Sequence, residues 1–408
     1  MQASLVSTQT QVESPFIILT IGQYTFGQST KKIGRYTKVT FPNFMQSLNI
    51  KKINGSINTY TIKISYQITE NDDPNMLEKV FSSISGDRKI KITYGDWMLP
   101  TYIYRDEEAM LTKVTSQVDF NNSKIDYTLT AVGTPGKLAG LRYNFSACVA
   151  KPSDIIKSLV KNKMYNLDTI FYGMKNIDDN KLSRLIVSDD IAVNLKAQTD
   201  VDLISYINYL VTCMRTSADS NTNIKQSVYY WASFDDITNE FGGPYFKVVR
   251  VDSDMQYTDS YSCYAIDIGY PSGNYVVNFS LNTTNLWSIL YSQSAELAIP
   301  EYTYDIDSKG NIISDYSPKL LNSQKYNTAT EATKDWWSKM TQFPLSATLT
   351  IKGLLKPALI TQSLKVNTYF FGKKHISSGM YIINKQEDII DSSGYRTILT
   401  LTRIKGDI

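Results

Sequence analysis

Residues 60–68 alternate between apolar and polar side chains, and this alternation limits the fold more than any other feature of the chain. The apolar positions are Tyr60, Ile62, Ile64, Tyr66 and Ile68. Successive side chains of a strand point to opposite faces, so the pattern predicts a strand with one buried face and one solvated face. Strand patterns return at residues 90–94, 345–351, 380–383 and 396–403, so we predict a mainly β chain.

Composition supports this prediction. The chain of 408 residues contains 29 Tyr and 15 Phe, and aromatic residues favour strands. Its apolar content of 42% is normal for a chain that buries a core. Its length favours about two or three domains.

We therefore predict an α+β chain that is mainly β, in which two small antiparallel β-barrels flank a mixed α/β middle domain. The first barrel-like domain takes residues 1–135 and has one helix. The middle domain takes residues 136–240, and the last barrel-like region takes residues 241–408. Within that last region, residues 286–343 form an extension with weaker patterning. Frequent turns between short strands are typical of barrels and sandwiches.

Several segments have the spacing of a helix with one apolar stripe rather than the spacing of a strand. The first follows an aspartate and a proline, which suit the start of a helix. The last contains the pair Trp336 and Trp337. Helices are predicted at residues 76–84, 152–160, 199–214 and 332–340.

The charge balance disfavours partners that are selected by bulk electrostatics. The chain has 42 basic and 39 acidic residues, so its formal net charge is +3. This small charge gives no general attraction to nucleic acid or to an acidic membrane. Residues 1–12 lack the charged and apolar regions of a signal peptide. No apolar run approaches the ~18 residues of a membrane span.

The cysteines indicate a reducing compartment. Cys148, Cys213 and Cys263 are odd in number and widely spaced. This pattern supports neither a disulfide framework nor a CxxC metal site. We expect the chain to fold in the cytoplasm.

Few residues are available for nucleophilic or metal-assisted catalysis. His375 is the single histidine, so any Ser-His-Asp or Cys-His site would depend on it, and its polar surroundings favour a turn. A histidine-rich zinc site is impossible. Asp305 and Asp307 match part of a calcium loop, but Lys309 stands where a ligand is needed, which favours a polar turn.

Carboxylates alone do not identify an enzyme here. A glycosidase needs two carboxylates on opposite sides of a sugar, and Asp235 and Asp236 are candidates, although a solvated loop explains them better. Neither glycine-rich phosphate motif occurs. We therefore predict a non-enzymatic protein without catalytic residues, cofactor or metal.

Two C-terminal segments resemble the closing strands of phage tail hub proteins, a family that includes contractile-tail baseplate hubs, late control protein D and the hub part of type VI secretion spikes. Residues 377–383 read SSGMYII, and residues 394–403 read GYRTILTLTR. Looser similarity occurs at residues 90–97, 151–156, 198–200, 276–280 and 347–353. The family-like positions are Gly379, Tyr381, Gly394, Tyr395, Thr397, Arg403, Gly95 and Asp96.

The resemblance implies a homotrimer with two similar barrels in each subunit, so that six barrels form a ring with pseudo-sixfold symmetry. Such a hub joins the tail tube to the central spike and contacts baseplate wedge or peripheral proteins. It implies a place in the tail baseplate of the virion, after assembly in the host cytoplasm. Closed barrels remove exposed strand edges, and a ring requires a heterologous interface.

Two other functions stay open at this point. A cell-wall or polysaccharide hydrolase carried by the same particle would need a cleft with a close pair of carboxylates. A receptor-binding tip would need exposed aromatic side chains in long loops, and Trp287, Trp336 and Trp337 are the candidates.

Overall fold

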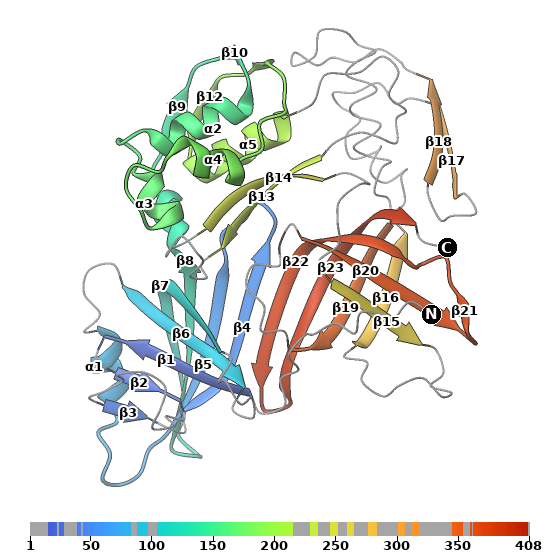
Figure 1. Ribbon diagram of the computed structural model, residues 1–408. Helices are drawn as coiled ribbons and strands as arrows, with labels where there is room; N and C mark the ends of the chain where they lie inside the picture. The colour runs from blue at the N-terminus through green and yellow to red at the C-terminus, as the bar shows by residue number, and fades with distance from the viewer. Residues whose placement is uncertain are drawn as a thin grey trace.

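Three units make up the described part of the chain (Figure 1). A first and a last β unit lie side by side, and a helical middle unit lies above the first one in this view. The mainly β prediction is confirmed. The computed structural model describes residues 15–22, 24–27, 39–41, 44–82, 88–96, 104–214, 229–235, 245–251, 259–264, 276–283, 301–306, 312–317, 345–353, 360 and 362–406.

The first β unit is built on strands whose apolar residues face one core. In β5 the side chains of Tyr60, Ile62 and Ile64 are buried, which confirms the strand predicted there. Each fully buried Ile contributes roughly 1.5–3 kcal/mol relative to an exposed one. The strands are β1 (Pro15–Ile21), β2 (Tyr24–Phe26), β3 (Val39–Phe41), β4 (Met45–Ile53), β5 (Thr59–Gln67), β6 (Lys89–Asp96), β7 (Tyr104–Asp119) and β8 (Lys124–Gly133).

Helix α1 (Met76–Ser82) packs against this core through Leu77 and Val80, which are both buried. Asp73 accepts a hydrogen bond from the backbone N–H of Asn75 at 2.9 Å, as the predicted start of the helix requires. The predicted helix is confirmed over residues 76–82, and residues 83–84 lie outside the described part.

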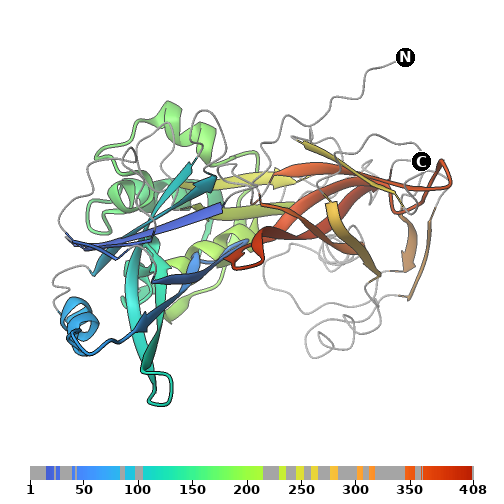
Figure 2. The ribbon, with the colours of Figure 1, turned by 90° about the horizontal axis from the view of Figure 1, so that it is seen from below.

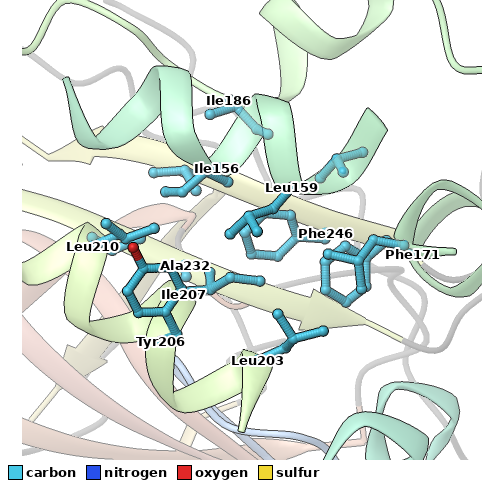
Figure 3. Close-up of a cluster of buried hydrophobic side chains, with 14 of the residues drawn as sticks. Ile156, Leu159, Phe171, Ile186, Leu203, Tyr206, Ile207, Leu210, Ala232 and Phe246 are labelled. Carbon is cyan, nitrogen blue, oxygen red and sulfur yellow. The ribbon is translucent and has the colours of Figure 1, made fainter. Parts of the chain in front are cut away.

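The middle unit packs helices against a two-stranded sheet. Figure 3 shows Ile156 and Leu159 of α2, together with Ile207 of α5, around Phe246 of β14 and Ala232 of β13. The helix predicted at 152–160 is confirmed as α2. The helix predicted at 199–214 is confirmed as α5 only from Leu203, because residues 199–201 belong to strand β12. The elements are η1 (Thr134–Leu138), β9 (Tyr143–Phe145), β10 (Cys148–Ala150), α2 (Pro152–Lys161), α3 (Leu167–Tyr172), α4 (Asp179–Leu185), β11 (Val193–Leu195), β12 (Gln198–Val201), α5 (Leu203–Cys213), β13 (Tyr229–Asp235) and β14 (Tyr245–Val251).

Aspartate carboxylates accept backbone hydrogen bonds at the starts of the main helices of the middle unit. Asp202 accepts a hydrogen bond from the backbone N–H of Ser205 at 2.9 Å and so caps α5. Helix α2 lacks a cap from its own preceding residue, and buried Asp190 instead accepts from the backbone N–H of Ser153 at 3.0 Å. The core of the unit extends to β14, because Phe246 is buried in it, although residue 240 was the predicted boundary.

The last β unit has its own core, formed by side chains such as Leu349, Val366 and Leu401. A separate hairpin, β17–β18, lies within the predicted extension 286–343. The predicted helix 332–340 and Trp287 lie outside the described residues. The strands are β15 (Asp259–Tyr264), β16 (Val276–Thr283), β17 (Glu301–Ile306), β18 (Ile312–Ser317), β19 (Leu345–Lys352), β20 (Ser363–Phe370), β21 (Lys373–Lys374), β22 (Gly379–Asp391) and β23 (Gly394–Gly406).

One sheet joins the two β units. β22 pairs antiparallel with β4, from Lys385 opposite Ile53 to Ile390 opposite Leu48, and we call this paired stretch the β4–β22 junction. Fifteen described strands thereby belong to one sheet, whose main path runs β16-β19-β23-β22-β4-β5-β8-β7-β6-β1-β2-β3. No described pairing closes either end of this path, so the two closed barrels stay a prediction.

The turn between β4 and β5 brings all three units together. The backbone N–H of Asn54 donates to the carbonyl oxygen of Asn384 in β22 at 2.9 Å, and the N–H of Gly55 donates to that of Ala232 in β13 at the same distance. The side chain of Asn208 in α5 donates to the Gly55 carbonyl. Gly55 has a φ of +70°, a conformation that a side chain disfavours.

Among the described helices, none has the length and apolar character to span a bilayer.

Candidate functional site

Four charged side chains meet in the interior where the two β units join. We call Lys52 of β4, Arg105 and Glu107 of β7, and Asp388 of β22 the buried charge cluster. Their exposed fractions are 1%, 4%, 0% and 0%, respectively. Burial of isolated charges is costly, so such groups must be paired and hydrogen-bonded. Two cations and two anions make the cluster electrically balanced.

The strand period places the charges inside. In β7 the inward row begins with Arg105 and Glu107 and continues with Ala109 and Leu111, all of which are buried. Glu108, between two of them, is exposed. The interior position of the charges therefore follows from the alternation of a strand.

Glu107 has donors from three other strands of the first β unit, β4, β5 and β6. Lys52 Nζ lies 3.1 Å from Oε1, Tyr94 donates to Oε1 at 2.7 Å, and Tyr60 donates to Oε2 at 2.7 Å. Burial alone would raise the pKa of Glu107, but the cations Lys52 and Arg105 and the two hydroxyl donors outweigh burial and hold this pKa below its ordinary value. Glu107 is therefore an anion in the folded protein at neutral pH.

Asp388 has a second set of partners on the last β unit. Thr397 donates to Oδ1 at 2.6 Å, Tyr395 donates to Oδ1 at 3.0 Å, and Gln386 donates to Oδ2 at 2.6 Å. Arg105 Nη1 stands 4.0 Å from Oδ2. Burial raises the pKa of Asp388 above its ordinary value, against the opposing effects of Arg105 and Thr397.

Arg105 interacts with both carboxylates of the cluster. Its guanidinium carbon stands 5.8 Å from the ring centroid of Tyr94, which is a cation–π distance. None of the described residues accepts a hydrogen bond from its three guanidinium nitrogens. Both Glu107 and Asp388 interact electrostatically with it. Arg105 therefore couples the first β unit to the last one through charge rather than through a hydrogen bond.

The outer face of the junction has a weaker set of contacts. Asn49 of β4 donates to Glu387 Oε1 of β22 at 2.9 Å, and Lys51 Nζ lies 3.5 Å from the same oxygen. Partly solvated cross-strand pairs of this kind contribute roughly 0.2–1 kcal/mol each. Side chains on both faces of the sheet thus join β4 to β22.

Two family-like positions, Tyr395 and Thr397, donate hydrogen bonds to Asp388 of the buried charge cluster. Gly394 begins β23 with a φ of +112°, which glycine tolerates best. Gly95 is buried in β6, opposite Tyr104. Asp96 ends β6 opposite Pro15, and its side chain lies outside the described part.

The other three family-like positions, Gly379, Tyr381 and Arg403, meet at the far end of the β22–β23 hairpin. Arg403 Nη2 donates to the Ser378 carbonyl at 2.8 Å, and the Tyr381 hydroxyl donates to the neighbouring carbonyl of Ser377 at 2.5 Å. A Cβ atom on Gly379 would stand 2.3 Å from a backbone oxygen, so only glycine fits there. The structure therefore brings five of the eight predicted positions together in two groups, one at Asp388 and one at the far end of the hairpin.

The residues considered for catalysis lie apart from the charge cluster. His375 follows β21 in a turn, as predicted, and its Nδ1 lies 2.8 Å from Ser377 Oγ. No described carboxylate bonds to this ring. Asp235 ends β13, and Asp236 lies outside the described part. Among described residues, no group of three His, Cys, Asp or Glu side chains is arranged for a metal ion, and Cys148 and Cys213 are unpaired.

Sequence reasoning missed Lys52, Arg105, Glu107 and Asp388. Their signal was charge at inward positions of strands: Glu107 shares its parity with Ala109 and Leu111, and Asp388 shares its parity with Ile390. Because β4, β7 and β22 are distant in sequence, only the tertiary structure shows that these four charged side chains meet.

Comparison with solved structures shows which known proteins have a similar fold. No family model matches the chain, and no curated protein matches it in sequence. Among solved structures, the 43 kDa tail protein of prophage MuSo2 from Shewanella oneidensis aligns over 97% of this chain and 99% of its own, with a TM-score of 0.51 and 9% identity. A tail protein from Neisseria meningitidis MC58 aligns over 96% and 97%, with a TM-score of 0.49 and 8% identity. An Escherichia coli component of the type VI secretion system aligns over 88% and 73%, with a TM-score of 0.46 and 8% identity. The resemblance to phage tail proteins is thus confirmed at the level of the fold.

Proposed function

We propose that this protein is a structural hub of a phage or phage-like tail baseplate, which joins the tail tube to the central spike as a symmetry adaptor. The observation that carries the proposal is a likeness to a prophage tail protein over 97% of the chain. In this proposal three copies form a ring, and the baseplate wedge or peripheral proteins contact its outside. The hub assembles in the host cytoplasm and remains in the virion.

The buried charge cluster supports a mechanical role. An adaptor between two symmetries must hold its two β units at a fixed spacing, because each unit occupies a defined place in the ring. The β4–β22 junction joins these units by backbone pairing, and the charge contact of Arg105 in β7 with Asp388 in β22 makes separation costly, since either charge left alone in the interior is strongly destabilising.

The same geometry weighs against the hydrolase alternative. Glu107 and Asp388 do converge, but both are fully buried and hydrogen-bonded to tyrosine and threonine hydroxyls. A catalytic pair must reach a sugar and a water molecule, and buried side chains in this arrangement reach neither. We therefore assign the cluster to structure rather than to catalysis.

Assembly of the purified full chain tests the proposal. We expect light scattering to give the mass of three copies and negative-stain images to show a ring, which tube and spike proteins of the same particle then bind on opposite faces. A chain that stays monomeric and joins neither partner contradicts the proposal. Cleavage of peptidoglycan that is abolished by a single carboxylate substitution would favour the hydrolase instead.

A further inference from the structure

The two ends of the molecule carry exposed apolar side chains in opposite electrostatic surroundings. Residues 370–376, around β21, form one end, which we call the basic tip. Residues 69–78, before and within α1, together with the β7–β8 turn at 118–123, form the other, which we call the acidic end. Helix α1 and strand β21 lie at opposite ends of the molecule in both views (Figures 1 and 2).

The basic tip presents aromatic rings to solvent. Phe371 is 79% exposed, and Phe370 and Ile376 are exposed beside it. Phe371 has a φ of +51°, which is unusual for a bulky residue and indicates a constrained turn. Lys373 is exposed in the same turn, and residues 353–386 contain no Asp or Glu. The tip is therefore both apolar and cationic.

The acidic end combines an exposed aromatic ring with carboxylates. Phe120 is 87% exposed and Val118 is 47% exposed, at the end of a hairpin that projects from the first β unit (Figure 2). The turn is fixed to the segment before α1, because the Ile68 N–H donates to the Ser123 carbonyl at 2.8 Å. That segment and α1 carry Glu70, Asp72, Asp73 and Glu78. Lys79 of α1 pairs with Asp73 at 2.6 Å, and the other three carboxylates keep this end acidic.

Each copy thus carries two surfaces that complement one another but not themselves. A contact between two basic tips, or between two acidic ends, would place like charges together, which is unfavourable. A contact between unlike ends is heterologous, and repetition of such a contact gives a closed ring or an open filament. Apolar anchors within a charged rim are the usual anatomy of a protein interface.

We propose that the basic tip of one copy docks on the acidic end of the next copy, with Phe371 and Phe120 as the apolar anchors. This inference rests on the proposed function, since it names the contact by which the hub ring closes. The charged rim brings Lys373 of one copy near Glu70 of the next. Screening by salt weakens such a contact.

Charge reversal tests the pairing. In the full chain, Lys373→Glu or Glu70→Lys alone should weaken assembly about tenfold, as measured by sedimentation velocity over a range of concentrations. The double variant Lys373→Glu with Glu70→Lys should recover the wild-type assembly, because the exchanged charges again attract across the interface. If the single substitutions weakened assembly only by damaging the fold, the double variant would not recover it.

Truncation of the anchor tests the apolar part. Phe371→Ser should weaken assembly about thirtyfold, as expected for an interface anchor. Val149→Ser is the matched control, because Val149 is 72% exposed but lies on β10 of the middle unit. It should leave assembly unchanged. Circular dichroism on each variant checks that the fold is retained.

The outcomes separate this inference from the proposed function. If folded charge-reversal and Phe371→Ser variants form the wild-type ring, the contact lies elsewhere and the inference is overturned while the hub proposal stands. A wild-type chain that never oligomerises overturns both. A third outcome is that the protein sediments with phosphatidylglycerol vesicles but not with phosphatidylcholine vesicles, and that Lys373→Glu abolishes this binding while the oligomer persists. This outcome would assign the basic tip to a membrane and would also overturn the inference.

Discussion

Buried charges stabilise the interior of the first β unit and, through Arg105 and Asp388, its contact with the last unit. Glu107 has Lys52, Tyr60 and Tyr94 as partners and no exposed surface. The net value of such an ion pair relative to apolar residues is small, but removal of one partner leaves a charge without compensation in the interior. The cluster therefore stabilises this particular arrangement against alternatives rather than the folded state in general.

Glu107→Gln should lower the free energy of unfolding by about 3–5 kcal/mol, because Lys52 then loses its buried countercharge. Urea titration at neutral pH measures the loss. Glu108→Gln is the matched control on the same strand, since Glu108 is exposed and points to the opposite face, and it should change stability by less than about 0.5 kcal/mol. Equal losses in both variants would contradict the structural role of the cluster.

The acid dependence of stability should carry the signature of Glu107. Its folded-state pKa lies below the ordinary value of 4.5, so its contribution is fully present above that value and is lost as pH falls through the folded-state pKa. The pKa of Asp388 is raised, so this residue changes stability with pH in the opposite direction. Its protonation in acid removes the cost of burying a charge. Urea titrations across this range should show the wild type and Glu107→Gln converging in acid. A difference that stays constant down to the folded-state pKa would contradict this assignment.

At the scale of elements, the β22–β23 hairpin determines the architecture because it belongs to two cores. Ile390 and Tyr395, near its turn, pack with the first β unit, whereas Tyr381 and Leu401 pack with the last. The hairpin can serve both units only if its strands stay close at both ends. Gly394 permits the turn, and Gly379 permits the close approach at the open end.

Gly379→Ala should destabilise the protein by about 1–3 kcal/mol, as overpacking does. The added Cβ would stand 2.3 Å from the Lys405 carbonyl oxygen and 2.9 Å from Arg403 Nε, so the strands must separate. Gly140→Ala is the control, because nothing lies within 4 Å of its Cβ position. Thermal unfolding followed by circular dichroism compares the two variants. A Gly379→Ala protein as stable as Gly140→Ala would show that the hairpin adjusts without cost.

At the scale of the whole molecule, the first β unit is incomplete without the end of the chain. Strand β4 has β5 on one side and β22 on the other, and the core of the first unit includes two residues of the last hairpin. The middle unit has a separate core, formed by residues between Leu138 and Val248. The first β unit is therefore completed by residues from the end of the chain, so it does not correspond to one continuous segment of sequence.

A fragment of residues 1–251 should fold its middle unit but not its first β unit. Loss of β22 leaves the β4 edge unpaired and removes the Asp388 carboxylate from Arg105. Amide hydrogen exchange should show slow exchange in α2 and α5 and fast exchange in β4 and β5. Protection of β4 and β5 equal to that in the full chain would contradict this dependence.

The sequence by itself determined the elements and their faces. The alternation at 60–68 predicted β5, and helical spacing predicted α1, α2 and α5, because period and capping are local properties. The resemblance to phage tail hub proteins, rather than a local signal, placed Gly379 and Gly394 in closing strands, and they begin β22 and β23. Local signals did not reveal β4, whose residues Lys51 and Lys52 interrupt a simple apolar pattern.

Only the tertiary structure decided how the units combine. Two separate β units were expected, whereas β4 and β22 pair across more than three hundred residues and make one sheet. Lys52, Arg105, Glu107 and Asp388 look like ordinary surface charges in sequence, because a charge shows no sign of its partner. Burial and pairing depend on neighbours that the chain brings together only on folding, and for that reason the charge cluster could not be read from any one segment.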